Sequence, residues 1–166
     1  MEIQSITSFL EYYARVRERT RRVVLLIPEA QLEWSYQPGK FSLGDLVRHI
    51  AAIERWLYAE TVLGRPSAYR GCGRDLADGR EAVIAYLDDM YSQSVEIFKQ
   101  LTPERLQAKI LTPTDQPITC WKWLRLLPEH EIHHRGQIYL MLNQLGVDTP
   151  QLYGLSAEDV QGRSIR

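Results

Sequence analysis

Apolar residues recur at intervals of three or four positions over four long stretches of this chain, and no other feature of the sequence restricts its fold as strongly. The stretches cover approximately residues 3–26, 42–64, 79–101 and 119–146. This spacing places the apolar side chains of each stretch on one face of an α-helix. Four such faces can be buried against one another, so the sequence predicts an all-α fold, a four-helix bundle. A chain of 166 residues is long enough for one complete core, and we expect residues 1–166 to form a single domain.

The ends of these helices carry residues that favour a helix start or stop. Ser42 is a good N-cap, and Asp45 three residues later completes a capping box. Pro28 and Pro103 follow the first and third helices, where proline prevents the helix from continuing. Gly146 is placed as the glycine that follows the last turn of the fourth helix.

Three connections join the helices. Residues 28–40 and 65–78 contain glycine and proline and are expected to be irregular. Residues 103–119 contain three prolines; we expect a short helical turn at residues 103–107, then an irregular crossing without a strand. The tail, residues 147–166, holds a few apolar side chains with which it is expected to pack on the bundle.

Three of the four histidines lie within five residues of the fourth helix, in the order His130-Glu131-Ile132-His133-His134. His130 and His134 are one helical turn apart and share the apolar face, on which His49 of the second helix also lies. A buried polar group without a partner costs about 1–3 kcal/mol, so three such groups at one level need a shared partner. A metal ion bound by His49, His130 and His134 provides one.

Three neutral imidazoles suit zinc, nickel or iron and leave the open position that is typical of a catalytic site. Asp45, one turn before His49, is expected to accept the hydrogen bond from the second nitrogen of that ring, with Glu131 as a looser candidate. His133 points about 100° away from His134 and is left outside the site. The competing interpretation is that a histidine on an apolar face, taken alone, is an ordinary hydrogen-bonded core residue.

The same five residues match the H-E-x-x-H pattern of zinc peptidases, in which Glu131 would be the general base. Such peptidases place a third ligand well downstream, where this chain offers only Glu158 in its tail, and they bind substrate along a strand that is not evident here. We therefore favour the site that includes His49.

Charge and composition restrict the partners. The formal net charge is −1, which gives no indication of nucleic acid binding, and no segment is apolar enough to span a membrane, so a cytoplasmic location is expected. Cys72 and Cys120 are expected to be reduced thiols. The first helix carries five arginines, which either recognise an anionic thiol or a phosphate or form a solvated outer face, and we favour the second interpretation. They are Arg15, Arg17, Arg19, Arg21 and Arg22.

Two segments of the chain resemble the DinB family, the DinB/YfiT-like group of metalloenzymes, and the resemblance covers nearly the whole chain. One segment, Ser42–Ile50, places a histidine shortly after the start of the second helix. The more specific segment is His130-Glu131-Ile132-His133-His134-Arg135-Gly136-Gln137, followed by Leu145-Gly146-Val147, Pro150 and Leu152-Tyr153-Gly154-Leu155. The resemblance implies an up-down-down-up bundle, usually dimeric, that binds a divalent ion through His49, His130 and His134.

The wider group includes transferases and isomerases that use bacillithiol, mycothiol or glutathione. The expected function is therefore that of a metal-dependent enzyme, a thiol-dependent S-transferase or a hydrolase, that acts on a small molecule and has Glu131 as a candidate catalytic residue. The alternative is a non-catalytic stress-response or metal-binding dimer, in which Glu54 or Glu131 closes the coordination of the ion. Expected partners are a small-molecule substrate and a second copy of the chain, with neither nucleic acid nor membrane.

Overall fold

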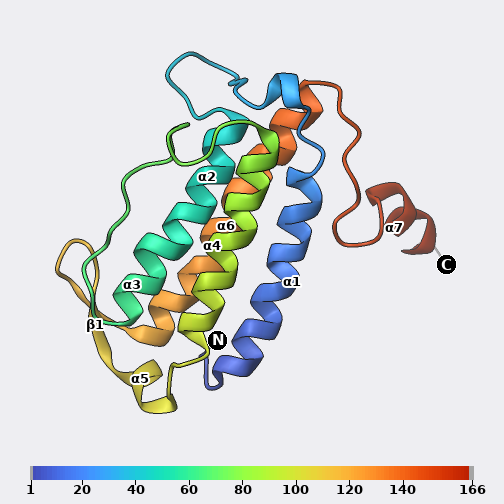
Figure 1. Ribbon diagram of the computed structural model, residues 1–166. Helices are drawn as coiled ribbons and strands as arrows, with labels where there is room; N and C mark the ends of the chain where they lie inside the picture. Colours follow the sequence, from blue (N-terminus) through green and yellow to red (C-terminus); the bar gives the residue numbers. More distant parts are fainter. Residues whose placement is uncertain (1, 165–166) are drawn as a thin grey trace.

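Four rods of helix lie side by side in the computed structural model, which describes residues 2–164 (Figure 1). The rods are α1 (Ile6–Val24), α2 (Leu43–Ile53) with η2 (Glu54–Tyr58) and α3 (Ala59–Val62), α4 (Arg80–Phe98) and α6 (Cys120–Gln144). In the second rod, the π-helical turn η2 separates α2 from α3. This architecture confirms the all-α bundle.

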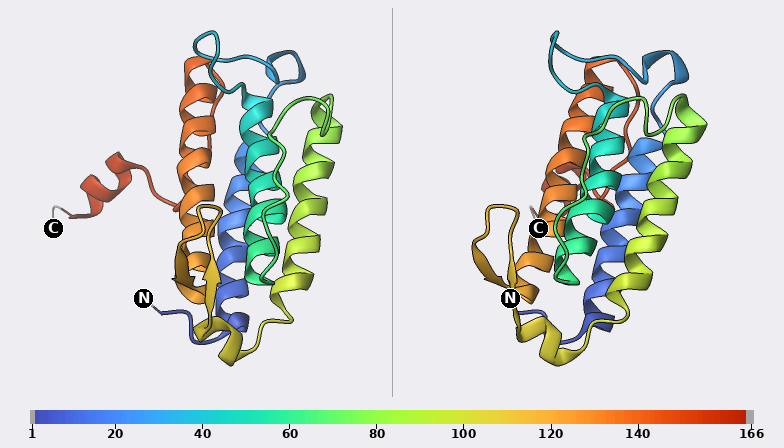
Figure 2. Two further views of the ribbon diagram at one scale, coloured as in Figure 1. Left: turned by 90° about the vertical axis from the view of Figure 1, so that its left-hand side faces the viewer. Right: turned by 60° about the vertical axis from the view of Figure 1, so that its left-hand side comes forward.

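The rods run up, down, down and up in chain order (Figures 1 and 2). The long connection after α3 returns along the bundle, so that α4 runs parallel to α2. Both α1 and α2 pack against α4 and α6, which places α1 and α2 at opposite corners of the bundle. The expected up-down-down-up topology is therefore confirmed.

The helix ends follow the capping residues. The Ser42 hydroxyl accepts a hydrogen bond from the Asp45 backbone N–H, and the Asp45 carboxylate accepts one from the Ser42 backbone N–H, both at 3.0 Å. This reciprocal pair is the predicted capping box. Gly146 follows α6 with a φ of +72°, a left-handed conformation that glycine adopts without a steric penalty, as predicted for that position.

The connection between α4 and α6 differs from the prediction. It begins with α5 (Pro103–Gln107), as expected, but then forms an antiparallel pair of β1 (Lys109–Leu111) and β2 (Pro117–Thr119). The prediction of an irregular crossing without a strand was wrong. Strands of three residues are too short to show the alternation from which a strand is predicted.

The apolar core is divided into two clusters along the bundle axis. One cluster contains Phe9, Tyr13 and Val16 of α1, and the other contains Val23 and Val24 from the other end of α1, with Ile27 from the turn that follows. Between the two clusters lies a layer of buried polar side chains. We call this set the polar layer: Arg17, Thr20, Glu54, Ser94, Glu131 and Arg135.

The tail packs on the bundle only in its first part. The Tyr153 hydroxyl accepts a hydrogen bond from Arg135 at 3.0 Å, and its ring lies under the Arg19 guanidinium at 5.2 Å. The following helix, α7 (Ala157–Ser164), buries no residue and projects away from the bundle (Figure 2). Over residues 2–164, no helix has the length and apolar character needed to cross a membrane.

Candidate metal centre

Three histidines from two neighbouring rods converge beside the polar layer. Nε2 of His130 lies 3.1 Å from Nε2 of His49 and 3.1 Å from Nε2 of His134, and the ligand atoms of all three lie within 4.8 Å of one another. Two nitrogens that bind one tetrahedral zinc ion at ~2.0–2.1 Å are about 3.3 Å apart. The structure thus brings together the three predicted residues at a spacing close to what one ion needs.

Hydrogen bonds to the second ring nitrogen fix the orientation of two of these rings. The Gln137 side-chain oxygen lies 2.7 Å from Nδ1 of His134, so that Nδ1 carries the proton and Nε2 keeps its lone pair for an ion. The Tyr69 hydroxyl lies 2.8 Å from Nδ1 of His49 and can accept a hydrogen bond in the same way.

The partner of His49 is therefore not the predicted one. Asp45 is held by the Ser42 backbone N–H and by the Arg48 guanidinium, whose Nη1 lies 3.1 Å from the Asp45 carboxylate. The hydrogen-bond partner of His49 is instead Tyr69, in the connection between α3 and α4. No spacing rule links a residue of a helix to a loop residue twenty positions later.

Replacing Tyr69 with phenylalanine is expected to weaken metal binding by about tenfold, because partners of ligand histidines are worth about 10–100-fold in affinity. The substitution removes only the hydroxyl that meets Nδ1 of His49. A competition titration of Zn²⁺ against a chromophoric chelator measures the affinity. Tyr12→Phe, at an exposed tyrosine of α1 that does not line the pocket beside the histidines, is the control, and an equal loss in both variants would contradict the role of Tyr69.

All three imidazoles are held in the neutral form. Burial lowers the pKa of His49 to about 4, with a smaller effect from His134, and lowers the pKa of His130 to about 3, where the other histidines add to the effect. Burial also lowers the pKa of His134, although its bond to Gln137 opposes the change. A neutral imidazole is the form that binds a metal ion, so the site is ready to do so at neutral pH.

The part of the chain that the structure describes adds no fourth ligand to the cluster. Among residues 2–164, the group of histidine, cysteine and acidic side chains with converging ligand atoms consists of these three histidines alone. Glu54 and Glu131, which would close the coordination of a structural ion, do not belong to it. The donor set therefore fits a divalent ion and leaves part of its coordination open.

Glu131 lies in the polar layer, on the α1 side of α6. Its carboxylate accepts a hydrogen bond from the Tyr13 hydroxyl at 2.9 Å and lies 3.0 Å from the Arg17 guanidinium, which also binds Glu54. Arg17 is thus buried between two carboxylates, contrary to the solvated outer face expected for the arginines of the first helix. A catalytic role of Glu131 stays a prediction.

The polar layer should make stability depend on pH. Burial raises the pKa of Glu54 to about 7, with Arg17 opposing and Glu131 adding to the shift, whereas an unfolded glutamate has a pKa of about 4.3. The folded protein therefore binds this proton more tightly, and the resulting stability is complete below about pH 4.3 and is lost as the pH rises through 7. The buried histidines give the opposite slope, but their contribution is essentially complete above the unfolded pKa of about 6.5.

Between about pH 4.5 and 7, we expect the free energy of unfolding of the metal-free wild-type protein to fall relative to that of Glu54→Gln, which has no proton to lose, and above about pH 8 we expect the difference to stay constant. Urea denaturation at a series of pH values measures it. Glu96→Gln, at an exposed glutamate paired with Lys99, should keep the wild-type slope. A Glu54→Gln variant with the same pH dependence as the wild-type protein would contradict proton binding by Glu54.

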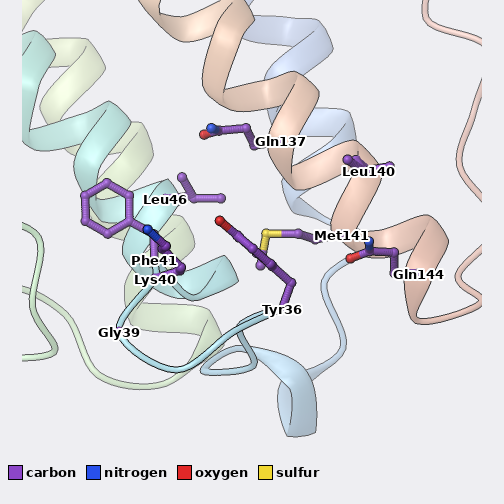
Figure 3. A pocket seen from close by; sticks show the side chains of 9 residues that line it. All are labelled: Tyr36, Gly39, Lys40, Phe41, Leu46, Gln137, Leu140, Met141 and Gln144. Carbon is purple, nitrogen blue, oxygen red and sulfur yellow. The ribbon is translucent and has the colours of Figure 1, made fainter.

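Nine residues line a pocket of about 520 Å³ (Figure 3), and two of them contact the ligand histidines. The ring of the lining residue Phe41 has its centre 5.3 Å from that of the His49 ring. The lining residue Gln137 is hydrogen-bonded to His134. On α6, the pocket wall continues the stripe of the two ligand histidines at helical spacing. The lining residues are Tyr36, Gly39, Lys40, Phe41, Leu46, Gln137, Leu140, Met141 and Gln144.

Sequence reasoning missed the pocket residues that lie outside the helices. Tyr36, Lys40 and Phe41 fall in or next to a stretch that was treated only as a connection. The available signal was two large aromatic side chains in a segment that has no apolar periodicity of its own. Large apolar residues in a connection need a surface to pack on or a ligand to contact.

The bundle topology and the three convergent histidines define a class of four-helix-bundle proteins with a candidate metal site. The sequence profile of the DinB superfamily matches residues 12–138, which include all three histidines. The chain therefore belongs to the DinB superfamily, as the resemblance implied. YjoA of Bacillus subtilis (strain 168) is 30% identical over 119 residues, which are 68% of this chain and 74% of YjoA.

Solved structures share the fold at lower sequence identity. YfiT from Bacillus subtilis, described as a probable metal-dependent hydrolase with an unusual four-helix bundle topology, has a TM-score of 0.71 and 18% identity over 89% of this chain and 91% of YfiT. The mycothiol-dependent maleylpyruvate isomerase has a TM-score of 0.64 and 12% identity over 81% of this chain and 60% of the isomerase. These comparisons confirm the bundle.

Proposed function

We propose that this protein is a metal-dependent enzyme in which His49, His130 and His134 hold one divalent ion, and that it acts on a small molecule as a thiol-dependent S-transferase or a hydrolase. The observation that carries the proposal is the convergence of three neutral imidazoles, without a fourth ligand among residues 2–164, at the edge of a pocket. When bound, a divalent ion supplies Lewis-acid chemistry, which lowers the pKa of a thiol or of a water molecule that reaches it.

The residues around the histidines have separate roles in this proposal. Tyr69 and Gln137 hold the rings so that the Nε2 lone pairs converge. Phe41 and Leu46 give the substrate an apolar wall next to His49 and keep water away from one side of the site. The orientation of the rings is thus fixed before a substrate arrives, which lowers the cost of binding it.

Two structural relatives support the choice of reaction class. The description of YfiT as a probable metal-dependent hydrolase supports water as the nucleophile. The mycothiol dependence of the isomerase with the same fold supports a low-molecular-weight thiol. Hydrolysis and thiol transfer both need an ion with an open coordination position, so both reaction classes stay in the proposal.

The H-E-x-x-H peptidase hypothesis is less well supported. It requires the carboxylate of Glu131 next to the ion, but this carboxylate is bound to Tyr13 and Arg17 within the polar layer. It also leaves unexplained why His49, from a different helix, completes the cluster.

Metal analysis followed by activity assays tests the proposal. We expect the purified protein to contain close to one divalent ion per chain, and X-ray absorption spectra to show three nitrogen ligands and exchangeable light-atom ligands. Transfer assays with bacillithiol, mycothiol and glutathione, beside an esterase and amidase panel, then separate the transferase from the hydrolase. A coordinatively closed ion without activity in any assay would favour the non-catalytic stress-response or metal-binding dimer.

A homodimer and a cytoplasmic location belong to the same proposal. Dimers are usual in the family that the sequence resembles, and apolar side chains on the outside of the bundle, among them Tyr12 and Leu25, are exposed. Size-exclusion chromatography with light scattering measures the mass in solution. A mass of one chain over the whole concentration range would contradict the dimer.

A further inference from the structure

The pocket beside the histidines has an unusual combination of lining residues. Lys40 is the only charged side chain among the nine lining residues, and none of them is acidic. The other polar groups are the amides of Gln137 and Gln144 and the Tyr36 hydroxyl, which reaches between Leu46 and Met141 (Figure 3). A single cation in a wall that is otherwise uncharged and mostly apolar favours a ligand with one anionic group.

Several large apolar side chains at this pocket are exposed to solvent. The exposed fractions are 56% for Tyr36, 43% for Phe41 and 59% for Leu140. Apolar surface that is gathered around a concave site gains about 25 cal/mol per Å² when a ligand covers it. The ligand should therefore have an apolar body as well as the anionic group.

The position of the pocket orients such a ligand. Phe41 contacts the His49 ring, and its neighbour in the chain, Lys40, lies on the same loop at the pocket rim. A molecule with its reactive end at the three histidines therefore lies along the apolar wall, with Lys40 on the rim beside it.

We propose that the pocket binds an amphipathic organic anion, with its apolar body against Phe41, Leu46 and Leu140 and its carboxylate paired with Lys40. This inference rests on the proposed function, because it assigns a substrate class to the same site. The expected ligand is a small molecule, because the pocket volume of about 520 Å³ lies within the range of small-molecule sites, about 300–1,000 Å³.

Binding of a matched probe series to the Co²⁺-loaded full-length protein tests the inference. The probes are ω-mercaptocarboxylates of three to eight carbons and the ω-mercaptoalcohols of the same lengths, followed by the thiolate-to-cobalt absorption band. We expect the best carboxylate to bind about fivefold more tightly than its alcohol, as an exposed charge pair allows. Lys40→Gln should abolish this preference and Lys40→Glu should reverse it.

Two variants serve as controls. Lys99→Gln, at a lysine that is paired with Glu96 and does not line the pocket, should keep the fivefold preference. Leu140→Ser changes an exposed side chain of the pocket and should weaken both probe types by about three- to tenfold, without changing the preference between them. Equal binding of acid and alcohol by the wild-type protein, or a preference that survives Lys40→Gln, would overturn the inference.

A second probe separates this inference from the proposed function. 4-Phenylbutyrate has the apolar body and the carboxylate but no metal-binding head, and its binding to metal-free protein is compared with that of 4-phenylbutanol by calorimetry. A protein that does not load Co²⁺ but prefers 4-phenylbutyrate in a Lys40-dependent manner would overturn the metal proposal and support the pocket. A protein that loads Co²⁺ but binds neither phenyl probe nor any mercaptan would overturn the pocket inference alone. A dimer that excludes all probes and dissociates when Leu140 is replaced by aspartate would identify the pocket as an interface and also overturn the inference.

Discussion

Replacing His134 with alanine is expected to remove the divalent ion from the purified protein and to lower its affinity by more than about 100-fold, because even the hydrogen-bonding partners of ligand histidines are worth about 10–100-fold. Nε2 of His134 lies 3.1 Å from Nε2 of His130, so its loss leaves only His49 and His130 of the three convergent ligands. Elemental analysis of the purified variant and a competition titration with Zn²⁺ measure the effect.

His133 provides a matched control on the same helix. Its ring lies beside that of His134, with the ring centres 4.8 Å apart, but it is exposed and does not belong to the convergent cluster. His133→Ala should keep the wild-type metal content and an affinity within about twofold, since it removes no ligand. Equal metal content in both variants, or a wild-type protein that binds no divalent ion, would contradict the three-histidine site.

The helices and the histidine cluster could be predicted because both depend on short-range regularities. Periodicity placed His130 and His134 one turn apart on the buried face of α6 and His49 on the buried face of α2. Once the bundle is assumed, two inward faces on neighbouring rods must meet. The capping residues Ser42 and Gly146 could also be predicted, because a cap acts within a few residues of the helix end.

The parts that the sequence did not reveal depend on contacts between distant segments. Tyr69 reaches His49 from a loop, and the direction of a loop over a bundle is not encoded by any local period. Arg17 was interpreted as one of five surface arginines, although it lies on the buried face of α1, between the buried residues Tyr13 and Thr20. A charge at an inward position was the missed signal, because a buried charge requires partners.

The polar layer connects the site to the stability of the bundle. Arg17 of α1 reaches Glu54, at the end of α2, and Glu131 of α6, which follows the ligand His130 in the chain. The two acids belong to the two rods that carry the three histidines, so one guanidinium from α1 contacts both of these rods beside the site. Burying Arg17 costs free energy, because its Nε and Nη1 have no hydrogen-bond partner among the described residues.

Replacing Arg17 with methionine is expected to destabilise the metal-free protein by about 3–5 kcal/mol, the cost of leaving a buried charge without its partner. Methionine fills a similar volume but leaves Glu54 and Glu131, both almost fully buried, without their shared cation. Urea denaturation in the presence of a chelator measures the free energy of unfolding without a contribution from metal binding.

Arg21→Met is the matched control, one turn further along α1. Arg21 forms a two-point pair with Asp88 at 2.9–3.0 Å, but both side chains are exposed, and the loss should stay below about 1 kcal/mol. Adding Glu54→Gln and Glu131→Gln to Arg17→Met removes both unpaired charges and should restore most of the lost stability. If Arg17→Met unfolds no more easily than Arg21→Met, or if the triple variant is as unstable as Arg17→Met, then Arg17 does not serve to neutralise the two buried acids.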